Sequence, residues 1–136
     1  MAIQGLDQLK RKLAALPQQT RRDLREALDK GADELVALQK NLVPIDSGDL
    51  RDSIRKEAGN HDLQVRVVAG GETTTKPVRE GQEQSFDYAL GVEFGTSDAE
   101  AQPFFFPAYR ALRRRIRSRI SRATRKAAQR VAGGGQ

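Results

Sequence analysis

The sequence predicts an α+β fold with long helices packed on a small, mostly antiparallel β-sheet. Two long stretches repeat leucine or isoleucine at helical spacing, whereas two shorter stretches between them alternate apolar and polar residues. A third observation is the polar stretch between those two strands, which predicts a long flexible loop. The 136 residues suit one domain, which we place at residues 1–131, followed by a disordered tail at residues 132–136.

The first long helix is expected at residues 18–42, after a short helix at residues 6–16 that Pro17 ends or bends. Its apolar stripe consists of Leu24, Leu28, Leu35, Leu38 and Leu42. Gly31 lies in the gap of this stripe, where a glycine permits close contact with another helix or with the sheet. Pro44 ends the helix, because a proline moves the residue before it into extended geometry.

A turn with three aspartates follows, and it has two alternative interpretations. Asp46, Asp49 and Asp52 surround a Ser-Gly pair, which suggests either a metal loop or helix capping. An EF-hand loop needs more acids and a glutamate at its twelfth position, and both are missing. Capping is therefore favoured, with Asp46 or Ser47 accepting from free backbone N–H groups and Asp49 completing a capping box. In this short helical turn, Leu50 and Ile54 are spaced to face the core together.

Two strands and a long connection are expected in the middle of the chain. Residues 63–69 alternate as a strand does, and residues 54–59 add a further strand. Residues 71–85 are polar and rich in turn formers, which predicts a mobile loop or an extended hairpin arm. Residues 86–96 show the clearest period of two, so we expect a strand with Phe94 on its core side and Glu93 on its solvent or subunit side.

The C-terminal helix begins near Pro107, since proline suits a first helical turn, and it ends at Gly133. Its apolar stripe is expected to contain Tyr109, Leu112, Ile116, Ile120, Ala123, Ala127 and Val131.

Charge is distributed unevenly along the chain. The net charge is +6, yet residues 107–136 hold ten Lys or Arg and no acid, so the remainder carries 14 − 18 = −4. Like charges four residues apart destabilise an isolated helix, and an anionic surface would relieve them. Three interpretations of this basic helix stay open: a solvated face, contact with DNA phosphates, or docking on acidic subunits.

Signals for catalysis and cofactors are weak. The chain has no cysteine, and His61 is the only histidine, so a nucleophile would have a single candidate base. The stretch AGGETTTK departs from a phosphate-binding loop because Thr75 replaces the glycine before the lysine. We therefore expect no enzyme activity, no cofactor and no metal. No apolar stretch is long enough for a signal peptide or a membrane span, which favours assembly in a cytosol and no membrane partner.

Three motifs occur in order: LVPIDSGDLRDSI, YALGVEFGT and QPFFFPAYRAL. Together they resemble the neck or tail-completion family of long-tailed bacteriophages, which is related to the minor tail protein Z of lambda-like phages and also occurs in prophages and gene transfer particles. The resemblance covers about residues 5–120. The residues that match its motifs are Pro44, Asp46, Ser47, Gly48, Leu50, Ser53, Tyr88, Ala89, Glu93, Phe94, Gly95, Thr96, Gln102, Pro103 and Phe104.

The resemblance implies a structural subunit of the virion neck, assembled in the cytoplasm of a bacterial host. It implies a homo-oligomeric ring, with a hexamer expected, between the head connector or stopper and the tail tube, as a tail completion or tail terminator protein. Contact with packaged DNA is a further expectation. Candidate interaction residues are Glu93, which would pair with the basic helix across a subunit boundary, Arg113, Arg114 and Arg117 on that helix, and Lys76 and Arg79 on the arm.

A competing function is a stand-alone nucleic-acid-binding protein that uses the basic C-terminal helix. Such a protein would bind duplex DNA with a steep dependence on salt and little sequence preference.

Overall fold

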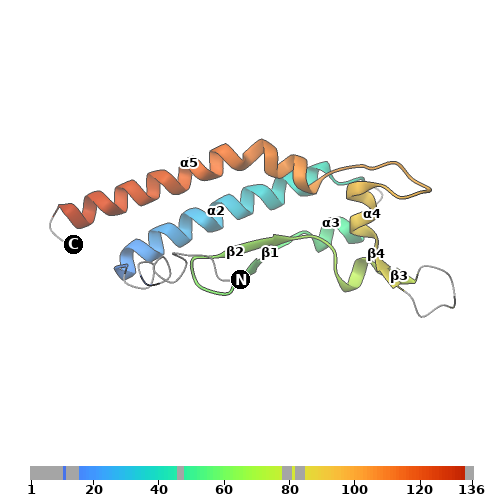
Figure 1. Cartoon of the computed structure of the whole chain (residues 1–136), viewed down its shortest axis with the longest axis horizontal. Helices are drawn as coiled ribbons and strands as arrows, with labels where there is room; N and C mark the ends of the chain where they lie inside the picture. Colours follow the sequence, from blue (N-terminus) through green and yellow to red (C-terminus); the bar gives the residue numbers. More distant parts are fainter. Residues whose placement is uncertain (1–10, 12–15, 46–47, 78–80, 82–84, 134–136) are drawn as a thin grey trace.

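The computed structural model describes residues 11, 16–45, 48–77, 81 and 85–133. Its long axis is formed by two helices, α2 (Gln18–Leu42) and α5 (Phe105–Ala132). Helix α2 lies between α5 and the antiparallel hairpin of β1 (Arg55–Ala58) and β2 (Val65–Val68), which gives three layers (Figure 1). This arrangement confirms the predicted α+β class.

The short elements gather at one end of the molecule (Figure 1). They are α3 (Gly48–Ser53), the 3₁₀ turn η1 (Glu72–Thr74), β3 (Thr75–Pro77), β4 (Ser85–Asp87) and α4 (Tyr88–Phe94). Strands β3 and β4 pair antiparallel, with Lys76 opposite Phe86, so the sheet consists of two separate hairpins rather than one surface. The predicted arm at residues 71–85 thus contains η1, β3 and the first residue of β4.

Several predicted elements agree with the structure in kind and position. Helix α2 has the predicted bounds, β2 lies within residues 63–69, and β1 is the further strand expected at residues 54–59. Pro107 lies in the first turn of α5, which ends before Gly133. The predicted helix at residues 6–16 lies outside the described residues except for Arg11 and Leu16.

The strand predicted at residues 86–96 is wrong beyond its first two residues. The chain forms β4 only as far as Asp87 and then turns into α4, where Asp87 accepts a hydrogen bond from Ala89 N. Phe86, Leu90 and Phe94 are four residues apart, and this spacing fits a helix as well as a strand. Alternation could not separate the two possibilities, whereas an aspartate able to cap a helix favours the helix.

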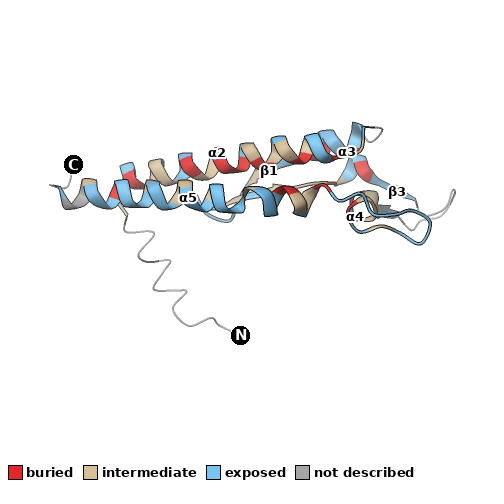
Figure 2. Cartoon of the chain, turned by 90° about the horizontal axis from the view of Figure 1, so that it is seen from above, coloured by how far each residue is buried: buried red, intermediate tan, exposed pale blue. Residues whose placement is uncertain are grey.

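Helices α2 and α5 approach each other through small residues. A side chain at Gly31 would lie 3.1 Å from Ile116 Cγ2, so the predicted close contact at Gly31 is confirmed. Ala27, Gly31, Ala32 and Leu35 are buried, whereas Leu42 at the end of the predicted leucine stripe is 45% exposed. Figure 2 shows the buried residues of α2 and the largely exposed outer surface of α5.

The stripe predicted for α5 is confirmed from Leu112 to Ala127, but its first member is wrong. Leu112, Ile116, Ile120 and Ala123 are half-buried and Ala127 is buried. Tyr109 is 41% exposed, so it does not belong to the contact with α2. Nothing is described of the side chain of Val131.

Ion pairs fasten α2 to the layers on both sides. Arg130 Nη1 lies 2.6 Å from Asp23 Oδ2, and Glu34 pairs with both Arg115 and Arg119 of α5. On the other side Arg21 pairs with Asp62, near the turn of the β1–β2 hairpin. Hydrogen bonds from these arginines hold the pKa of Asp23, Glu34 and Asp62 below the usual carboxyl range.

We expect acid to weaken this three-layer arrangement. A carboxyl whose pKa is lower in the folded state stabilises the fold above its unfolded pKa of about 4, and that contribution is lost as pH falls through the folded value. Urea unfolding at pH 7, 4 and 3 should therefore show a loss of stability below about pH 4. The double variant Asp23→Asn/Glu34→Gln should lose less free energy of unfolding on acidification than the wild type. The single variant Glu26→Gln, whose side chain is exposed on α2, should lose as much as the wild type. If the free energy of unfolding of the double variant fell with pH as steeply as that of the wild type, the stabilising role of Asp23 and Glu34 would be contradicted.

The main core lies at the end where α3, α4 and the start of α5 meet. It is formed by Val43, Leu50, Ile54, Ala89 and Phe104, and each of these is at most 6% exposed. The prediction that Leu50 and Ile54 face the core together is confirmed. Ser53 lies between them and is also buried, and its hydroxyl accepts a hydrogen bond from Gly70 N at 2.8 Å. The aspartate-capping hypothesis depends on residues 46 and 47, which lie outside the described residues.

Candidate assembly surface

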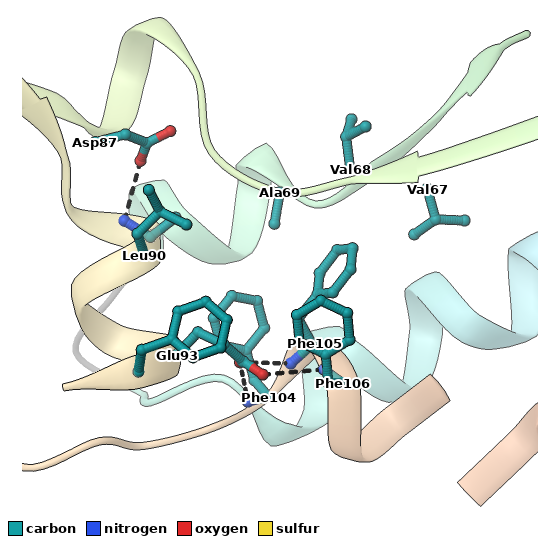
Figure 3. A pocket seen from close by; sticks show the side chains of 11 residues that line it. Val67, Val68, Ala69, Asp87, Leu90, Glu93, Phe104, Phe105 and Phe106 are labelled. Carbon is teal, nitrogen blue, oxygen red and sulfur yellow. Dashed lines mark hydrogen bonds between the residues drawn. The ribbon is translucent and has the colours of Figure 1, made fainter. Parts of the chain in front are cut away.

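Glu93 joins α4 to the start of α5. Its carboxylate accepts hydrogen bonds from the backbone N–H groups of Phe104 at 2.8 Å, Phe105 at 2.9 Å and Phe106 at 3.0 Å. Figure 3 shows the carboxylate directed at the first turn of α5. A helix leaves its first backbone N–H groups without partners, and the next residue, Pro107, has none to offer. Glu93 therefore satisfies three of the free N–H groups at the start of α5, and Pro107 leaves no fourth N–H group in need of a partner.

This geometry corrects the expected position of Glu93. The strand interpretation placed it toward solvent or another subunit, but its exposed fraction is 6%. A buried carboxylate at a helix N-terminus is also favoured by the helix dipole. Because the carboxylate bonds within the chain, we do not include Glu93 in the surface offered to partners.

Asp87 holds the other end of α4. Its two oxygens accept from Gly71 N at 2.9 Å, from Thr74 Oγ1 at 2.6 Å and from Ala89 N at 3.0 Å. Gly70 has a φ of 89°, and a side chain there would lie 2.3 Å from Asp87. Asp87 thus links η1 to α4. The sequence prediction missed this residue because its only local signal is an aspartate just before a helical stretch.

An apolar groove lies between α4, β2 and the start of α5. It has a volume of about 370 Å³, and Val67, Leu90, Phe94, Phe105 and Phe106 are among its lining residues (Figure 3). Leu90 is 65% exposed, Phe94 64% and Phe106 44%. The rings of Phe94 and Phe106 contact each other with centroids 6.0 Å apart. An exposed apolar cluster of this kind is typical of an interaction surface.

A row of arginines continues from this cluster along α5. Phe106, Arg110, Arg113 and Arg117 are spaced by four, three and four residues, which places them on one face of the helix. We define the assembly surface as Leu90, Phe94 and Phe106 together with Arg110, Arg113, Arg114 and Arg117. All seven are exposed, and the four arginines make no ion pair with any other residue in the described part of the chain. Phenylalanine and arginine are both enriched at protein interfaces.

The remaining candidate residues lie in different settings. Lys76, on β3, lies over the ring of Tyr88 with its Nζ 5.1 Å from the centroid. Burial raises the pKa of Tyr88, with Asp49 and Asp87 contributing. Arg79 lies outside the described residues, so the structure does not place it relative to the assembly surface.

The motif residues have mainly structural positions. Pro44 and Tyr88 are half-buried, and Leu50 and Phe104 are in the core. Gly95 ends α4 with a φ of 82°, and Thr96 accepts at its hydroxyl from Asp98 N and Ala99 N. Gly48 and Pro103 are exposed, whereas Asp46 and Ser47 lie outside the described residues. These motifs therefore build the junction of α3, α4 and α5.

Other kinds of site have little support in the described residues. Within residues 16–45, 48–77 and 85–133, no three His, Cys, Asp or Glu side chains are grouped as metal ligands. His61 is exposed in the turn between β1 and β2. No helix in the described part of the chain is long and apolar enough to cross a bilayer.

The fold and surface define a small α+β protein with an exposed apolar and basic surface suited to contact with other macromolecules. Residues 7–95, more than half of the chain, match the family model described as "Bacteriophage HK97-gp10, putative tail-component". The chain belongs to this HK97-gp10-like family of phage tail components. No curated protein and no solved structure matches the chain significantly. The predicted resemblance to a head–tail family of phages is thereby confirmed.

Proposed function

We propose that this protein is a structural subunit of the phage neck, which completes the tail and joins it to the head connector. Membership of a phage tail component family is the observation that carries the proposal. The exposed cluster of Leu90, Phe94 and Phe106 supports it, because a subunit held among others needs apolar contact area. In this proposal the protein acts as a closed ring of identical subunits located in the virion.

The proposed partners are other copies of the chain, the connector or stopper on the head side and the tube protein on the tail side. The proposal is for a tail completion or tail terminator role, since both positions lie at the end of the tube that meets the head. A ring also suits a chain with two long helices side by side, because its outer surfaces are large relative to its core.

Deletion of the gene and complementation in trans test this proposal. Without the protein, filled heads and separate tails should accumulate in the electron microscope, and infectious particles should fall by several orders of magnitude. An epitope-tagged copy that restores particles should be labelled by antibody only at the head–tail junction. Label along the whole tube or at the distal tip, or normal particles from the deletion strain, would contradict the neck assignment.

A further inference from the structure

The exposed cations of α5 and the exposed carboxylates that have no ion pair in the described part of the chain lie on different parts of this molecule. Helix α5 carries seven exposed Lys or Arg that have no ion pair within the described residues: Arg110, Arg113, Arg114, Arg117, Arg122, Arg125 and Lys126. The exposed carboxylates with no ion pair to another described residue all lie elsewhere: Asp49, Asp52, Glu72, Asp98 and Glu100. These five lie on α3, on η1 and in the connection between α4 and α5, which is the end where the short elements gather (Figure 1). Arg51 and Lys76 are also exposed at this end without an ion pair to a described residue, so it is acidic on balance, and we call it the acidic end.

The acidic end is held in shape before any partner arrives. In the loop between α4 and α5, Thr96 N donates to Ala99 O at 2.9 Å and Gln102 N donates to Val92 O at 2.7 Å. The Thr96 hydroxyl accepts from Asp98 N at 3.3 Å and from Ala99 N at 3.1 Å. The backbone that carries Asp98 and Glu100 is therefore ordered, and a partner would lose little entropy on binding it.

This separation favours one kind of self-association over another. Two copies that met through the same arginine face would bring like charges together, which disfavours a twofold contact. Contact between the acidic end of one copy and the arginine face of the next brings opposite charges together. A contact between two different surfaces repeats from copy to copy and closes into a ring when the rotation allows.

We infer that the assembly surface binds the acidic end of a second copy of this chain, with Arg113, Arg114 and Arg117 facing Asp98 and Glu100 of that copy. Phe94 and Phe106 supply the apolar part of the contact. The inference deepens the proposed ring by naming the two surfaces that meet. It concerns residues that lie mostly after position 95, where the match to the family model ends.

Charge reversal of each surface tests the inference in the purified full chain. The basic-reversed variant carries Arg113→Glu, Arg114→Glu and Arg117→Glu, and the acid-reversed variant carries Asp98→Lys and Glu100→Lys. Self-association is measured by sedimentation velocity at several protein concentrations and at salt concentrations from 50 to 500 mM. Over this range the Debye length falls from about 13 Å to about 4 Å. Each variant alone should associate at least about tenfold more weakly than the wild type, because close charge pairs at interfaces couple strongly.

Two further samples identify the contact itself. Mixing the two variants should restore association, since each supplies the surface that the other needs, and combining all five changes in one chain should do the same. A matched control, Arg22→Glu, Arg122→Glu, Arg125→Glu, makes the same charge change away from the proposed contact and should associate as the wild type. Circular dichroism of every variant establishes that the helices are retained.

The outcomes separate this inference from the proposed function. A wild-type chain that stays monomeric at high concentration and low salt, or variants that associate as the wild type, would overturn the inference whatever the particle assay shows. A basic-reversed variant that associates as the wild type but no longer binds duplex DNA would also overturn the inference. Normal particles from the gene deletion would instead overturn the proposed function and leave the self-contact to be judged by sedimentation alone.

Discussion

Replacing Glu93 with alanine is expected to lower the free energy of unfolding by about 3 kcal/mol. The substitution removes the acceptor of three backbone N–H groups at the start of α5, and one of them belongs to the buried Phe104. Urea unfolding monitored by circular dichroism measures this loss of free energy. Both α4 and α5 should become less stable, because Glu93 joins them.

Two control variants separate the causes of this loss. Glu93→Gln keeps one acceptor oxygen but lacks the charge that favours a helix N-terminus, so its loss should be intermediate. Glu100→Ala removes an exposed carboxylate from the same region and should change stability by less than about 0.5 kcal/mol. If Glu93→Ala were as stable as Glu100→Ala, the capping role of Glu93 would be wrong.

Replacing Phe104 with alanine is expected to destabilise the fold by about 4 kcal/mol, the usual cost of removing a buried aromatic ring. Phe104 is 1% exposed and packs in the cluster with Leu50 and Ile54. The measurement is again the free energy of unfolding. Phe104→Leu, which keeps most of the apolar volume, should lose markedly less than Phe104→Ala.

The matched variant is Phe106→Ala, two residues further along the same run of phenylalanines. Phe106 is 44% exposed and contacts Phe94, so its removal should cost less than about 1 kcal/mol of stability. It should instead weaken self-association by about tenfold, because aromatic side chains often carry much of the binding energy at an interface. The reverse pattern, with Phe106 needed for folding and Phe104 only for association, would contradict the placement of the core and the assembly surface.

The sequence by itself determined the two long helices and the stretches that form β1 and β2, whereas the antiparallel pairing of these strands came from the structure. The apolar repeats of the two helices are long enough to distinguish a period of 3.6 residues from a period of two. Pro44 marks the end of α2 and Pro107 the start of α5, because proline restricts the backbone locally. Three ordered motifs also sufficed for the family, because a motif depends on residue types and spacing rather than on contacts.

Only the tertiary structure decided that residues 88–94 form a helix rather than a strand, and that Glu93 caps α5. Phe86, Leu90 and Phe94 satisfy both a strand and a helix over so short a stretch, so local pattern could not choose. The partners of Glu93 lie eleven to thirteen residues away along the chain. Whether a glutamate faces solvent or caps a distant helix depends on how α4 and α5 pack, and whether a phenylalanine belongs to the core or to the surface depends on the same packing.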